Sequence, residues 1–124
     1  MSAGGNLQAS LAGALTALEI TGVFDGPPAR ASFPYVVIDA GMESDWSHKS
    51  GEGREVLVAV TVWDDQPSRL HGLADAAEAA VLGTTMVTGW QLVFLRLIRR
   101  RTVRDVAGPW AAAIDFRARL LANN

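Results

Sequence analysis

The sequence offers few residues whose types and spacing would support catalysis. Its two histidines, His48 and His71, do not lie in a metal-binding pattern such as HExxH, and it contains no cysteine. No GxSxG nucleophile elbow is present. Asp64 and Asp65 follow a predicted strand and precede a predicted helix, a position that suits carboxylate ligands but is more often occupied by solvated turn residues. We therefore expect no catalytic residue, no metal site and no cofactor.

The densest chemical feature is a group of basic residues in the segment RLIRRRTVR. Five arginines lie there: Arg96, Arg99, Arg100, Arg101 and Arg104. Such a cluster can neutralise phosphates, but it contains no aromatic residue for base stacking and no known nucleic-acid-binding motif surrounds it. Three interpretations stay open: direct contact with DNA, a solvated hairpin, and a basic face that meets an acidic neighbouring subunit.

A second feature is a tryptophan in the polar stretch GMESDWSHKSGEG, residues 41–53. A packed indole buries roughly 150–250 Å², so a ring left in water on a loop forfeits several kcal/mol at about 25 cal/mol/Å². Either the loop folds back on its own domain or a partner covers the ring. We expect partner contact at the tip, through Asp45, Trp46, Ser47, His48 and Lys49.

The charges are unevenly distributed along this chain of 124 residues. Residues 1–95 hold 11 acidic and 4 basic residues, a net of −7, whereas residues 96–124 hold 2 acidic and 7 basic residues, a net of +5. This split favours head-to-tail association of unlike faces. We expect the arginines to lie on a different face from a set of acidic residues, namely Asp39, Glu43, Asp45, Glu52 and Glu55.

Hydrophobic periodicity indicates how these residues are positioned. Helical spacing and strand alternation predict elements at 6–20, 35–40, 54–64, 68–82 and 90–97, and a last strand from Trp110. Asn6 is the expected N-cap of the first helix, and the apolar run WQLVFLRL is expected to be a central strand that Arg101 to Asp105 continue or pair with. A short extended piece is possible at Val23 and Phe24.

These elements predict a single α+β domain, residues 1–124. Its antiparallel or mixed sheet has about four to five strands, two helices pack on one face, and a long hairpin projects with residues 41–53 at its tip. No apolar run approaches the ~18 residues of a membrane span, and the first residues carry no basic segment before an apolar core. We therefore expect a cytoplasmic product without membrane contact.

Several segments together resemble the tail-terminator (tail-completion) proteins of long-tailed phages and phage-like gene transfer agents. They are VFDGPP followed by FPYVVI, DWSHKSGEG running into a valine-rich strand that ends in VW, an alanine-rich second helix and a closing strand with FRARL. The resemblance implies a virion structural protein, not an enzyme. It also implies the role of that family, whose members form a hexameric ring on the head-proximal end of the tail tube, end tube polymerisation and join the tail to the head connector.

The resemblance also implies partners and a place. The partners are other copies of the chain, the tail tube protein and a head-closure or stopper protein, and DNA passes through the ring without specific binding. The place is the head–tail junction of a virion assembled in the host cytoplasm. Two alternatives stay open: a stopper protein one layer closer to the head, and a small ligand-binding or enzyme domain in which Trp63, Trp90 and Trp110 line an apolar pocket between helix and sheet.

Overall fold

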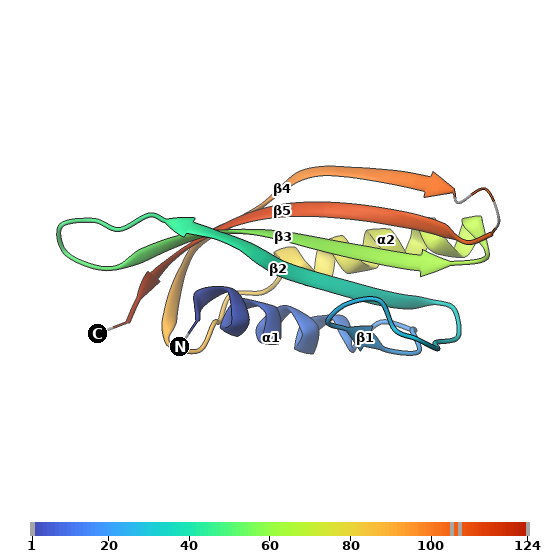
Figure 1. Cartoon of the computed structure of the whole chain (residues 1–124), viewed down its shortest axis with the longest axis horizontal. Coiled ribbons are helices and arrows are strands. Elements are labelled where there is room, and N and C mark those ends of the chain that lie inside the picture. Colours follow the sequence, from blue (N-terminus) through green and yellow to red (C-terminus); the bar gives the residue numbers. More distant parts are fainter. Residues whose placement is uncertain (1, 105, 107, 124) are drawn as a thin grey trace.

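The protein is a five-stranded sheet with two helices on one face (Figure 1). The computed structural model describes residues 2–104, 106 and 108–123. The elements along the chain are α1 (Ala3–Leu15), β1 (Val23–Phe24), β2 (Tyr35–Asp45), β3 (Gly53–Asp64), α2 (Pro67–Leu82), β4 (Trp90–Arg104) and β5 (Trp110–Ala122). The predicted α+β class and the two helices on one face are confirmed, and the two-residue β1 pairs in parallel with β2, which makes the sheet mixed.

Helix α1 begins and ends earlier than the sequence suggested. Its N-cap is Ser2, whose hydroxyl accepts a hydrogen bond from the amide of Gly5, and its C-cap is Thr16. The expected N-cap, Asn6, lies inside the helix and its side-chain amide donates instead to the carbonyl of Thr88 at 2.9 Å. Ser2 lies three residues before Gly5, the spacing at which a serine hydroxyl can accept from a free amide of the first helical turn, so Ser2 caps the helix in place of Asn6.

The β2–β3 hairpin is longer than predicted. Strand β2 continues five residues past Ala40 to Asp45, with a bulge between Asp39 and Met42, so the turn between the strands is residues 46–52 alone. In Figure 1 the hairpin extends well past the N-terminal end of α1, which confirms the projecting hairpin. The predicted end of the strand at Ala40 was wrong because a bulge accommodates Gly41 inside the strand. The Asp39 carboxylate stabilises this bulge by accepting a hydrogen bond from the amide of Gly41.

The strand order is β1-β2-β3-β5-β4, which places β4 at an edge of the sheet. The expectation of a central strand at WQLVFLRL was therefore wrong. Strands β3 and β5 pair over twelve residues, so β5 occupies the position beside β3 and leaves β4 outside it. Strand β4 does continue past Leu97, to Arg104, and Asp105 lies outside the described residues.

One face of the sheet is buried under the helices and the other is open. The inward positions of β3 and β5 alternate as predicted, because β-strand side chains point to opposite faces in turn; the fully or almost fully buried ones are Val56, Val58, Val60, Val62, Ala112, Ile114, Phe116, Ala118 and Leu120. Helix α1 packs on β2, and α2 packs on β3 and β5. No described helix is both long enough and apolar enough to cross a lipid bilayer.

Helix α2 is attached to the sheet by an ion pair at the end of β3. The carboxylate of Asp64 is fully buried and accepts two hydrogen bonds from the guanidinium of Arg69, at 2.7 Å from Nε and 2.6 Å from Nη2. It also accepts from the amide of Gln66, the N-cap residue of α2. Asp64 and Asp65 thus both lie in the strand-to-helix turn, but only Asp65 is solvated, and the expectation of a solvated carboxylate was wrong for Asp64, which is buried against Arg69.

Candidate functional site

The hairpin tip is an ordered turn. The amide of Trp46 donates to the carbonyl of Gly53 at 2.9 Å, and His48 and Gly51 exchange main-chain hydrogen bonds around Lys49 and Ser50. The Ser47 hydroxyl donates to the Asp45 carboxylate at 2.6 Å and accepts from the amide of Gly53 at 3.1 Å. The hydrogen bond from Ser47 lowers the pKa of Asp45, so this exposed carboxylate stays charged at the tip.

The Trp46 ring packs partly against its own domain, although its place in a projecting tip suggested that a partner would cover it. Its ring is partly buried, packs edge to face on His48 with centroids 4.6 Å apart, and lies 5.2 Å from the guanidinium carbon of Arg119 on β5. Arg119 also lies 5.1 Å from the ring of Phe94 and donates to Glu55 at 2.8 Å. Local packing therefore covers part of the indole, while Asp45, Ser47, His48 and Lys49 are exposed.

The five arginines of β4 do not form one cluster. Pairing with β5 places Arg96, Arg99 and Arg101 on the open face, opposite Arg117, Asp115 and Ala113, and places Arg100 and Arg104 on the helix-covered face. They separate because neighbouring side chains of a strand point to opposite faces, with a bulge between Leu97 and Arg99 shifting the register once.

Four of these arginines have partners within the chain. Arg99 donates to Asp115 at 2.8 Å, and Arg100 bridges Asp75 at 2.8 Å and Glu78 at 3.2 Å on α2. Although burial opposes its charge, hydrogen bonds to these two carboxylates raise the pKa of Arg100. The guanidinium carbons of Arg96 and Arg104 lie 4.4 Å and 5.4 Å from the ring centres of Phe94 and Trp110. Arg101 forms no ion pair with another residue of the described ranges.

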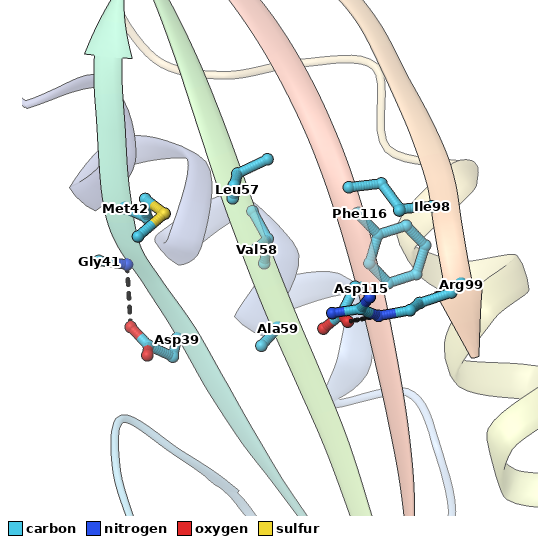
Figure 2. A pocket seen from close by; sticks show the side chains of 10 residues that line it. All are labelled: Asp39, Gly41, Met42, Leu57, Val58, Ala59, Ile98, Arg99, Asp115 and Phe116. Carbon is cyan, nitrogen blue, oxygen red and sulfur yellow. Dashed lines mark hydrogen bonds and ion pairs between the residues drawn. The ribbon is translucent and has the colours of Figure 1, made fainter. Parts of the chain in front are cut away.

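The open face carries charges of both signs, contrary to the expected separation of acidic residues and arginines. A shallow depression of about 280 Å³ runs across the sheet, and its lining includes Asp39 from β2, Ala59 from β3, Asp115 from β5 and Arg99 from β4 (Figure 2). Cross-strand pairing puts these four residues in one row. Glu55 shares the same face and pairs with Arg117 and Arg119.

The three tryptophans proposed to line one pocket lie apart. Trp63 is on the open face, stacked 6.5 Å from Tyr35, where it lines a second depression. Trp90 and Trp110 are on the helix-covered face at opposite ends of the β4–β5 pair. Trp90 lies opposite Ala122 in the strand pairing, and Trp110 lies opposite Arg104. The pocket on which the ligand-binding alternative depended is therefore not formed.

The two histidines do not come together with other ligands. His48 is at the hairpin tip and His71 is exposed on α2. Over residues 2–104, 106 and 108–123, no group of three or more histidine or carboxylate side chains is arranged to hold a metal ion.

Comparison with known proteins agrees with this architecture. A family model described as "Tail completion protein gp17" matches residues 6–121. The chain belongs to this tail completion protein family. A solved structure titled "Virion of native gene transfer agent (GTA) particle" contains a chain that is 27% identical, with a TM-score of 0.73 over 95% of this chain and 96% of that chain. A comparison with curated proteins gave no match.

Sequence reasoning missed part of the surface of this tail completion protein. Arg119 joins the tip to the sheet through Trp46, Phe94 and Glu55, and Asp115 holds Arg99. The signal was present in the alternation of β5, which puts Asp115, Arg117 and Arg119 on one mixed face. Their partners were not predictable, because they depend on the order β3-β5-β4.

Proposed function

We propose that this tail completion protein is a virion structural protein that forms a ring, a hexamer, on the head-proximal end of a tail tube. There it ends tube polymerisation and joins the tail to the head connector. The observation that carries the proposal is the family match over residues 6–121, supported by the likeness to a chain of a gene transfer agent virion over 95% of this chain.

The shape of the molecule fits this role. The two edges of the sheet are different, with the short β1 at one edge and the fifteen-residue β4 at the other, so copies that meet edge to edge around a ring would do so through unlike surfaces. The hairpin projects beyond α1 and carries the exposed Asp45, Ser47, His48 and Lys49. These residues are suited to contact the tube below or the connector above the ring.

The proposed passage of DNA without specific binding also fits the side-chain contacts. Arg99 and Arg100 are held by carboxylates of the chain itself. A guanidinium that already donates to a carboxylate has less capacity to hold a phosphate, and each phosphate contact would retard a passing duplex. On the open face, Asp115 and Glu55 are the carboxylates that occupy arginines in this way, because Asp115 pairs with Arg99 and Glu55 pairs with Arg117 and Arg119.

A polymerisation assay with the tail tube protein tests this function. Tube growth is followed by light scattering and tube lengths are measured by electron microscopy, with and without the purified protein. A terminator stops growth at substoichiometric amounts and leaves the number of tubes unchanged. A protein that leaves tube growth unaffected but binds the isolated head connector is a stopper protein, and one that does neither contradicts the proposal.

A further inference from the structure

Strand β4 presents a long unpaired edge with apolar side chains in water. Val93 is 42% exposed and Ile98 is 45% exposed, and no described strand lies beyond β4 in the sheet. Soluble proteins usually protect an edge with short strands, bulges or charges, because free main-chain amides and carbonyls pair with other chains. The edge formed by β4 has fifteen residues, and although it contains two bulges and five arginines, Val93 and Ile98 stay exposed, which is typical of a surface that a partner covers.

The opposite edge has complementary properties. Strand β1 covers β2 at Val36 and Val37, and among the residues that the structure describes no strand lies on the outer side of β2 from Ile38 to Asp45. This segment carries three acidic residues, Asp39, Glu43 and Asp45, and no basic residue, and its Met42 is 66% exposed. The strand at one edge thus carries Arg101 and exposed apolar residues, while the strand at the other edge carries acidic residues and the exposed Met42.

The geometry points to a strand-to-strand interface in which β4 of one copy packs along the Ile38–Asp45 segment of β2 in the next copy. The inference rests on the proposed ring and names the contact that closes it. Strands β2 and β5 run in one direction and β3 and β4 in the other, because successive neighbours after β1 are antiparallel. A rotation about an axis along the strands therefore brings β4 beside β2 in antiparallel orientation.

The level of the contact follows from the register within one copy. Asp39 pairs with Ala59, Ala59 with Asp115 and Asp115 with Arg99, so Asp39 and Arg99 lie at the same height on opposite edges of the same face. A second copy placed alongside without a shift brings its Asp39 opposite Arg99, with Arg101 on the diagonal, a separation that long side chains span.

Main-chain pairing is confined to part of this segment. The amide of Ala40 already donates to the side-chain oxygen of Gln8 at 3.3 Å, and the amide of Gly41 donates to Asp39. Pairing therefore runs along Met42–Asp45, beyond the bulge. There the described residues form no such main-chain bond on the outer side of β2, and the Glu43 side chain accepts from the amide of Gly4. Asp39 contributes through its charge.

The same charges disfavour the competing two-fold contact. Antiparallel pairing of β4 with β4 of another copy would set the arginines of both strands against each other, and like charges at opposing positions destabilise a sheet. Pairing of β4 with β2 replaces this repulsion by attraction. The basic edge thus favours a head-to-tail contact, which closes into a ring, over a two-fold dimer.

Disulfide crosslinking tests the interface, because the chain has no native cysteine. Asp39→Cys is mixed with tagged Arg99→Cys or Arg101→Cys, bound to tail tubes and oxidised. Within one chain β2 and β4 are three strand spacings apart, about 14 Å, beyond the reach of a disulfide. We expect mixed dimers with Arg99→Cys and fewer with the diagonal Arg101→Cys, because diagonal positions are about 7–8 Å apart. The chain that carries both Asp39→Cys and Arg99→Cys should form a ladder of oligomers, and reduction should remove all of these crosslinks.

The control and the contrary outcomes keep the two proposals separate. Ala76→Cys, exposed on α2, mixed with Arg99→Cys should give no mixed dimer. Capped tubes without crosslinks between position 39 and position 99 or 101, or with Arg101→Cys self-dimers instead, overturn the interface while the terminator function stands. If the wild-type protein binds no tube end, the proposed function fails, and mixed dimers formed in solution would then support the interface alone.

Discussion

The guanidinium carbon of Arg119 lies 5.2 Å from the centre of the Trp46 ring and so connects the hairpin tip to the sheet. The same guanidinium lies 5.1 Å from the Phe94 ring and donates to Glu55, so residues from β3, β4, β5 and the tip meet at one point. The tip is therefore held in a defined direction before any partner binds. A preordered contact arm loses less conformational entropy on docking than a flexible one.

Trp46→Ala should lower the free energy of unfolding by only about 1–2 kcal/mol, because the ring is partly buried and its contacts are with His48 and Arg119. The larger effect should be on binding to tail tubes, measured by cosedimentation. Trp90→Ala is the matched control for a core indole, since Trp90 is 7% exposed, and it should cost about 3–5 kcal/mol. A loss in Trp46→Ala as large as in Trp90→Ala would show that the tip tryptophan serves the core.

Gly53→Ala should destabilise the hairpin, because a Cβ at Gly53 would collide with the main-chain carbonyl of Trp46. We expect a loss of about 1–3 kcal/mol in denaturant unfolding. A Cβ at Gly51, two residues earlier in the same turn, meets no atom within 4 Å, so Gly51→Ala should change stability by less than about 1 kcal/mol. Equal effects of the two substitutions would contradict the close approach of the strands at Gly53.

Arg100→Ala and Arg101→Ala should differ although the residues are adjacent. Arg100 joins β4 to Asp75 and Glu78 of α2, so its loss should cost about 1 kcal/mol of stability in thermal unfolding. Arg101 has no ion pair within the described ranges, so Arg101→Ala should leave the melting temperature unchanged and reduce ring assembly, read by native mass spectrometry. An intact ring in Arg101→Ala together with intact stability would remove Arg101 from the subunit interface.

Arg69→Ala should destabilise the fold by about 2 kcal/mol, less than the 3–5 kcal/mol of fully buried pairs because Arg69 is partly exposed. The cost arises because the Asp64 carboxylate, 0% exposed, loses its two hydrogen bonds from the guanidinium. Arg99→Ala, which breaks an exposed pair with Asp115, is the control and should cost less than about 1 kcal/mol.

The Asp64 pair also predicts a dependence of stability on pH. Hydrogen bonds from Arg69 lower the pKa of Asp64 below the ordinary value of 3.8, although burial opposes this. The unfolded chain therefore binds this proton more readily, so the stabilisation is complete above that value and is lost as pH falls through the folded-state pKa. The stability difference between wild type and Asp64→Asn should shrink below pH 3.8, and a constant difference in acid unfolding curves would contradict the pair's role.

The sequence predicted the elements that have strong periodicity, and it failed where tertiary pairing decides. The alternation in β3 and β5 and the alanine-rich α2 were readable because their inward residues repeat at strand or helix spacing. The edge position of β4 was not, since an apolar run reads the same in a central strand as in an edge that a partner covers. The arginines looked like one cluster because they are close in sequence. Strand alternation separates them in the structure, since it places the adjacent Arg100 and Arg101 on opposite faces.

The central claim is a ring at one end of the tail tube, and cryo-electron microscopy of tail tubes incubated with the purified protein tests it most directly. The predicted result is a single extra ring on one end of each tube, six-fold in end-on averages, with the hairpins of neighbouring copies pointing along the tube axis. Tubes with two identical bare ends, or protein bound along the tube wall, would contradict the account.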